Sequence, residues 1–492
     1  MYLPNEVVDA ILESLGRRDL KSARLVCKTW CSCASPFLFD KTYVAPNRVD
    51  LEVFKAITQH PILSKCIRQL VYDCCEFVPN LKKRTYIEGL WVQTETLLSR
   101  GKISPHSSDP QINEWTNDVA SRNFSTKERV TKWKHRDLID RGYEEYQKHA
   151  VYQGRALRNG HFVDSLVKGL SRLVHLTSVT LDGEWPNSLE TSFCEHHCGT
   201  PLARKWNPFH YCPNEWFWEA DENDPDDLPV GIRHYWNITT ALTDKQRQID
   251  NFTTGHHDSG YLGISPEVFK GFDPMPPNSP GSDITALSGL KDLELHFASC
   301  NGRSAAEYCD NIERLPKLLG SMHSLLRLCL DLSLDSSYSA GESPNLYRHD
   351  QVFPQAILWN DLVMLELSNF SSSATDLLHL LLIQMPNLKH TVFGTMQLLD
   401  GCWESVVECL KQFHSFTYFE IYLWSFLHHE GGRVLRMDYG TINEYVMFGG
   451  RHPCLSGDQP ASASEAYMLR IDTSLRDRLR LGADSSRSDV AM

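Results

Sequence analysis

The residues with the clearest capacity for chemistry are cysteines and histidines gathered between positions 194 and 212. The runs CEHHC and HYC in this stretch hold sulfur and imidazole donors. Tetrahedral zinc prefers such ligands, and a structural zinc ion can tie down a loop that lacks a core of its own. A zinc site here would use Cys194, Cys198, His210 and Cys212. Neither half has the C-x2-C spacing of common zinc knuckles, so chance clustering is the alternative interpretation.

The sequence lacks the motifs of the common catalytic classes. It contains no HExxH, no phosphate-binding P-loop, no GxGxxG and no GxSxG placed between a strand and a helix. The adjacent histidine pairs at 256–257 and 428–429 would point to opposite faces of an extended chain, so neither pair alone chelates a metal. We therefore expect a protein without catalytic activity, and without a cofactor unless zinc binds.

Composition narrows the class of protein further. The chain has 492 residues, of which 41% are hydrophobic and 23% charged, which is enough for a large buried core. Its formal net charge of −13 argues against a general binder of nucleic-acid phosphates. The N-terminus lacks the pattern of a signal peptide, and no run approaches the about 18 apolar residues of a membrane helix. The expected location is the cytoplasm, the nucleus or both, with the 15 cysteines reduced.

The first 35 residues predict three short helices, the elements that would position any N-terminal binding site. Apolar residues at helical spacing form one wide stripe on the first helix. The stripe consists of Val7, Val8, Ile11, Leu12 and Leu15. Gly16 is expected to end this helix and Asp19 to cap the second. The third is expected to stop before Pro36, because the residue ahead of a proline avoids the helical region.

These helices also match a family pattern. The start LPNE, the run RLVCKTW at 24–30 and the following proline and Leu-Phe pair together resemble an F-box over roughly the first 40 residues. The resemblance implies docking onto the Skp-type linker subunit of a cullin–RING ubiquitin ligase. The residues it implicates in docking, or in shaping the docking surface, are Leu3, Pro4, Ile11, Leu12, Leu15, Leu20, Leu25, Val26, Cys27 and Trp30. Cys27 is expected to pack as a small hydrophobe rather than to act as a nucleophile.

The remainder of the chain repeats a helical stretch followed by alternating leucines. The pattern L-x-x-L-x-L is the signature of leucine-rich repeats, in which strands and helices stack into a solenoid. It is clearest at 287–297, 318–332 and 359–370. The arrangement resembles the divergent leucine-rich-repeat-like domains that follow many fungal F-boxes. The expected fold class is α/β, a three-helix F-box followed by an irregular solenoid with long insertions. The alternative is a generic α/β domain with parallel strands.

These features predict a domain order and a function. The expected parts are an F-box at 1–45, first repeat-like units with a helical insertion at 46–183, a loop-rich aromatic and acidic insert at 184–286, further repeat-like units at 287–425, a cap region at 426–481 and a disordered tail at 482–492. We expect a substrate-recognition adaptor that binds the Skp-type linker with its cullin, and an unknown protein substrate. The alternatives are an F-box scaffold outside any ligase, or a zinc-binding protein whose start matches the F-box by chance.

Overall fold

The computed structural model divides the chain into two compact units. Unit 1 comprises 1–265 and 276–286, and unit 2 comprises 266–275 and 287–492. The residues that the structure describes are 4–74, 77, 80–87, 89–91, 114, 117, 136–182, 230–255, 264, 266–269, 282–297, 312–332, 347–354, 356–394, 396–401, 403–412, 416–421, 428–430, 433–435 and 445–448. Among these residues, no helix is both long enough and apolar enough to cross a membrane.

Three helices begin unit 1, as the sequence predicts. They are α1 (Asn5–Glu13), α2 (Arg17–Ala23) and α3 (Lys28–Leu38). The expected cap of the second helix is wrong, because Gly16 is the N-cap and Asp19 lies in the first turn, where its carboxylate complements the helix dipole. The expected end of the third helix is also wrong, because α3 continues through Pro36. The last residue of α3, Leu38, packs in the core of the three helices.

Four parallel strands form the sheet of unit 1. They are β1 (Lys41–Val44), β2 (Gln69–Asp73), β3 (Ser178–Asp182) and β4 (Asn251–Thr254). Each strand pairs with the next in chain order, so a crossover joins every pair. The described helices between them are α4 (Arg48–Gln59), α5 (Leu63–Cys66), α9 (Arg136–Arg158), α10 (His161–Leu170) and α12 (Val230–Asp244).

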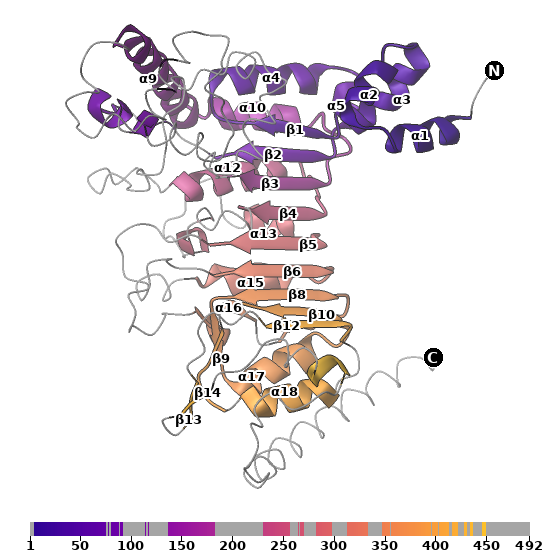
Figure 1. Ribbon diagram of the computed structural model, residues 1–492, viewed down its shortest axis with the longest axis vertical. Helices are drawn as coiled ribbons and strands as arrows, with labels where there is room; N and C mark the ends of the chain where they lie inside the picture. The colour runs from indigo at the N-terminus through magenta and orange to yellow at the C-terminus, as the bar shows by residue number, and fades with distance from the viewer. Residues whose placement is uncertain are drawn as a thin grey trace. The chain divides into compact units, whose positions relative to one another are not determined.

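The helices α4 and α10 pack closely against each other beside these strands (Figure 1). Gly169 of α10 makes this approach possible, because a Cβ at that position would overlap the ring of Phe54 in α4. Phe54 itself is fully buried, as are Phe162 and Leu166 of α10. The tight contact fixes the helical layer that covers this part of the sheet.

The region 184–286 contains more regular structure than the expected loop-rich insert. Its described part includes α12, whose buried face carries Ile232, Tyr235 and Ile238, and the strand β4, whose Phe252 is fully buried. The segment NFTT of β4 has one large apolar residue and no alternating leucines, so the leucine pattern could not reveal it. Residues 184–229 lie outside the described part of the chain.

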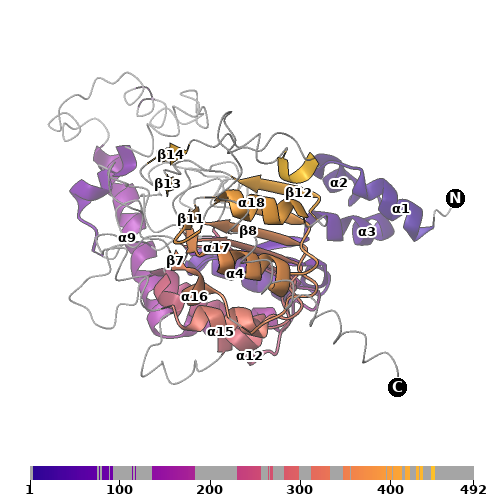
Figure 2. The same ribbon diagram turned by 90° about the horizontal axis from the view of Figure 1, so that it is seen from below.

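Unit 2 has five parallel strands in the order β5-β6-β8-β10-β12. They are β5 (Asp292–His296), β6 (Arg327–Asp331), β8 (Met364–Ser368), β10 (His390–Phe393) and β12 (Tyr418–Ile421). The helical segments of this region are η4 (Pro266–Phe269), α15 (Arg314–Ser321), α16 (His349–Val352), α17 (Ala374–His379), the π-helical η5 (Leu380–Gln384) and α18 (Trp403–Gln412). The unit boundary falls within α13 (Ser282–Leu287). In both views α17 and α18 lie together (Figures 1 and 2).

The leucine pattern at 287–297, 318–332 and 359–370 correctly predicts the strands β5, β6 and β8. Its leucines form the buried face of the sheet, as at Leu293, Leu295, Leu328 and Leu330, each with no exposed surface. Side chains alternate between the faces of a strand, so the residues between these leucines occupy the opposite face. That face is polar along β5 and β6, where the sequences are DLELH and RLCLD.

A second, smaller set of parallel strands follows the ends of the main strands. It contains β7 (Tyr347–Arg348), β9 (Phe370–Ser372) and β11 (Met396–Leu398) in the order β11-β9-β7. The chain turns from β8 into β9 at Asn369, whose φ is +60°. It turns from β10 into β11 at Gly394, where a Cβ would lie 2.8 Å from the Cβ of Ser368. A short antiparallel pair, β13 (His428–Glu430) and β14 (Arg433–Leu435), completes the described strands.

Candidate functional site

The three N-terminal helices enclose a small core of their own. Its buried residues are Val8, Leu12, Leu20, Ala23, Ala34 and Leu38. The residues packed partly buried against them are Leu15, Trp30, Cys33, Phe37 and Phe39. The guanidinium of Arg24 lies 4.7 Å from the centre of the Phe39 ring, a cation–π contact at the end of α2. This core holds the three helices in a fixed arrangement, so the residues left outside it form a defined surface.

Among the described residues of this helical module, four large apolar residues face solvent. Leu25 is 87% exposed and Val26 is 67% exposed, and both lie in the turn between α2 and α3. Val7 and Ile11 are 44% and 38% exposed on α1, where their spacing of four puts them on one face. Large exposed apolar residues on so small a module indicate that it binds a protein partner. We call these four residues the N-terminal apolar surface.

The docking residues expected from the sequence fall into two groups in the structure, one buried in the helical core and one exposed. Leu12 and Leu20 are buried in the helical core, and Leu15 and Trp30 pack against it. Leu3 lies outside the described residues. The others are exposed and available for contact, and these are Pro4, Ile11, Leu25, Val26 and Cys27.

One expectation about this group is wrong. Cys27 does not pack between the helices but is exposed, because it is the N-cap of α3 and its extended backbone directs the chain away from the helix. The cysteine that packs against the core is Cys33, and burial raises the pKa of its thiol, as does the carboxylate of Asp9. The predicted zinc ligands at 194–212 lie outside the described residues.

A second candidate site is the polar face of the unit 2 sheet. Arg327 of β6 reaches across to β5, where its Nη1 lies 3.6 Å from Asp292 Oδ2 and 3.5 Å from Glu294 Oε2. His296 Nε2 lies 2.9 Å from Glu294 Oε1, and its Nδ1 lies 3.7 Å from Asp331 Oδ2. These five residues form a connected charged cluster on two adjacent strands.

Burial and charge shift the acid–base properties of this cluster. Burial lowers the pKa of His296, but its hydrogen bonds with Asp331 and Glu294 outweigh that effect and raise it to about 9. The Cys329 thiol is almost fully buried on the same face, and burial, together with Glu366 and Glu294, raises its pKa strongly. This cluster was not predicted from the sequence. The pattern that indicates it is the alternation of charged residues with leucine in DLELH and RLCLD.

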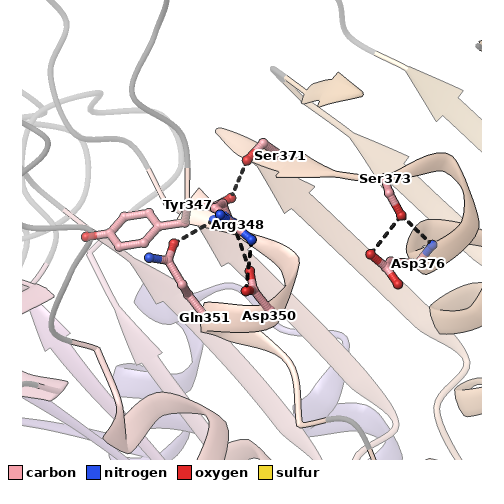
Figure 3. A network of polar contacts seen from close by, with 7 residues as sticks. All are labelled: Tyr347, Arg348, Asp350, Gln351, Ser371, Ser373 and Asp376. Carbon is pink, nitrogen blue, oxygen red and sulfur yellow. Dashed lines mark hydrogen bonds and ion pairs between the residues drawn. The ribbon is translucent and has the colours of Figure 1, made fainter. Parts of the chain in front are cut away.

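Another polar network in unit 2 has a structural role (Figure 3). At α16, the backbone amide of Arg348 donates to Gln351 Oε1 at 2.9 Å, and its guanidinium binds both oxygens of Asp350 at 3.0 Å. At α17, Ser373 Oγ accepts the amide of Asp376 at 2.9 Å. These contacts cap the first turns of two short helices, which accounts for the residues without invoking a ligand.

The comparison with known families identifies the N-terminal module. Residues 1–44 match the family model described as F-box-like, a span that contains α1, α2, α3 and β1. No curated protein matches the chain. The family match supports an F-box protein and a role in F-box-type protein interaction. F-box domains typically bind Skp-type linker proteins, and the proteins that carry them are generally non-catalytic adaptors.

Proposed function

We propose that this chain is the substrate-recognition adaptor of a Skp–cullin–F-box ubiquitin ligase, acting in the cytoplasm, the nucleus or both. The observation that carries the proposal is the coincidence of the F-box-like match at 1–44 with the exposed Leu25 and Val26. A linker groove that covered these two side chains would remove them from water, a contribution of about 1.5–3 kcal/mol per large apolar side chain fully buried. The adaptor performs no bond chemistry and acts by bringing substrate and ubiquitin-loaded enzyme together.

We propose further that the strands and helices after the F-box form a leucine-rich-repeat-like solenoid that binds a protein substrate. The order of the strands supports this, since within each unit every strand of the main sheet pairs with the next main-sheet strand along the chain, and a helical segment lies between most of them. The leucines of unit 2 give the sheet one fully buried face. On the opposite face Asp292, Glu294, Arg327 and Glu366 are partly exposed, whereas His296 and Cys329 are buried. The partly exposed charged residues of that face are the natural place for a substrate.

The test is a pull-down with the purified Skp-type linker and its cullin. The test variant is the double substitution Leu25→Asp, Val26→Asp, which places two charges on the N-terminal apolar surface. The matched control is Val174→Asp, because Val174 is also an apolar residue of unit 1, is 51% exposed and lies outside the F-box-like region. Circular dichroism of all three proteins verifies that each is folded.

The outcomes separate the proposed function from its alternatives. We expect wild type and the Val174→Asp variant to capture linker and cullin together, and the double variant to capture neither. Capture of the linker without the cullin would indicate a scaffold outside any ligase. Failure of the wild-type chain to bind the linker would refute the adaptor function. Equal loss with Val174→Asp would show that the effect of the charges is not specific to the F-box surface.

A further inference from the structure

Two neighbouring strands of unit 2 bring together a set of metal-binding side chains. Glu294 and His296 are two residues apart on β5, and Cys329 and Asp331 are two residues apart on β6. The register pairs Glu294 with Cys329 and His296 with Asp331. Residues two apart on a strand share a face, so all four side chains belong to the polar face of the sheet.

The donor atoms of three of these residues converge. One carboxylate oxygen of Glu294, one ring nitrogen of His296 and the sulfur of Cys329 all lie within 4.8 Å of one another. Zinc bonds of about 2.0–2.3 Å in a tetrahedron place donor atoms roughly 3.5 Å apart. Movements of the side chains by about 1 Å would therefore bring the three donor atoms to zinc-binding distances. Cys329 and His296 are 1% and 6% exposed, so these two ligands are held within the packed structure.

Neighbouring residues contact the remaining polar atoms of His296 and Glu294. His296 presents Nε2 toward Glu294 and Nδ1 toward Asp331, at 3.7 Å from Oδ2. A metal-bound histidine typically donates its other N–H to a carboxylate, and Asp331 occupies that position. Asp331 is itself held through Oδ1, which accepts the side-chain amide of Asn369 at 2.8 Å. Arg327 lies near Oε2 of Glu294, while Oε1 is the oxygen on the side of His296.

From this arrangement we propose that Glu294, His296 and Cys329 bind one zinc ion, with Asp331 as a positioning residue. Because the pKa values of both groups are raised in the absence of metal, zinc binding must displace one proton from the Cys329 thiol and one from the His296 imidazolium to solvent. Cys329 then binds as the thiolate and His296 as the neutral imidazole. The carboxylates of Asp292 and Glu366 flank the ligands, as register neighbours of Arg327 and Cys329, and add negative charge that favours a dication. Three protein ligands leave a fourth coordination position for water, the pattern of an open zinc site.

The experiment titrates Co²⁺ and then Zn²⁺ into the full-length chain after treatment with a chelator. Cobalt bound to a thiolate gives a charge-transfer absorption in the near ultraviolet, and zinc displaces it. The variants Cys329→Ser and His296→Gln remove ligands. The matched control Cys66→Ser removes another buried cysteine, in α5 of unit 1. A second control, Cys194→Ser with Cys212→Ser, removes half of the zinc cluster predicted from sequence.

The expected result is one bound metal per chain at this site, seen as a thiolate absorption that both ligand variants abolish and both controls retain. Asp331→Asn should keep the absorption but weaken zinc binding by about 10–100-fold, the usual effect of losing the partner of a metal-bound histidine. If Cys329→Ser fails to fold, the zinc affinity of Asp331→Asn tests the proposal instead.

Two results would overturn the proposal. One is a wild-type chain that gives no thiolate absorption with Co²⁺. The other is an absorption that survives Cys329→Ser but is lost when Cys194 and Cys212 are replaced, which would assign the metal to the other cluster. Linker capture through the N-terminal apolar surface is measured separately, so failure of the zinc site would leave the adaptor function standing.

Discussion

Leu12 and Leu25 are the same residue type in the same small module, and truncating each to alanine should have opposite consequences. Leu12 has no exposed surface and lies in the core of the three helices, whereas Leu25 is 87% exposed in the turn between α2 and α3. If the apolar surface exists to bind a partner, Leu12→Ala should destabilise the module, and Leu25→Ala should leave its stability intact while weakening the linker complex.

The magnitudes follow from burial. Replacing a fully buried leucine with alanine costs about 2–5 kcal/mol, because transfer energy is lost and a cavity remains. Fully burying a leucine contributes roughly 2 kcal/mol, so the small covered part of Leu25 accounts for only about 0.3 kcal/mol of stability. The exposed part is available to a partner, and burying it in the linker groove would contribute about 1.7 kcal/mol, or roughly a 20-fold change in affinity.

Hydrogen exchange of the full-length chain, followed on peptides from the first 44 residues, measures the local stability. Leu12→Ala should accelerate exchange in α1, α2 and α3 by about 30-fold or more, and Leu25→Ala by less than about twofold. Titration calorimetry with the linker measures the affinity. The reasoning is refuted if Leu25→Ala accelerates exchange as much as Leu12→Ala, or if it leaves the affinity for the linker unchanged.

Three further predictions concern packing, pH and helix capping. Gly394→Ala should destabilise unit 2 by about 1–3 kcal/mol in urea unfolding, because the new Cβ would lie 2.8 Å from the Cβ of Ser368, and Ser368→Gly should recover part of that loss. Burial lowers the pKa of His349, so the unfolded chain takes up its proton first. Unit 2 should therefore lose stability as the pH falls below about 6.5. Thermal unfolding at about pH 5 and about pH 7 should show this loss in the wild type but not in His349→Phe; the same pH dependence in both proteins would contradict the prediction. Asn47 Oδ1 accepts the backbone amide of Asp50 at 2.9 Å as the N-cap of α4. Asn47→Ala should therefore lower the free energy of unfolding by about 1 kcal/mol in urea unfolding, and an unchanged value would show that the cap contributes nothing.

The leucine pattern predicts β5, β6 and β8 because each of these strands buries one row of leucine side chains, which the sequence shows directly. It fails at β1 and β4, where KTYV and NFTT are short and carry few apolar residues. Those strands form because their backbones pair with neighbours distant in sequence. Such pairing leaves no local pattern of hydrophobicity to detect.

Sequence by itself determined the class of the N-terminal module and the alternation of leucine with polar residues, since both depend on residue types at fixed local spacing. Only the tertiary structure decided that Leu12 is covered while Leu25 is exposed, because the turn after α2 carries Leu25 away from the core. It alone brought His296 beside Cys329, 33 positions apart, through the register of two parallel strands. Residues distant along the chain meet through backbone pairing and helical crossovers, and no local spacing encodes that meeting.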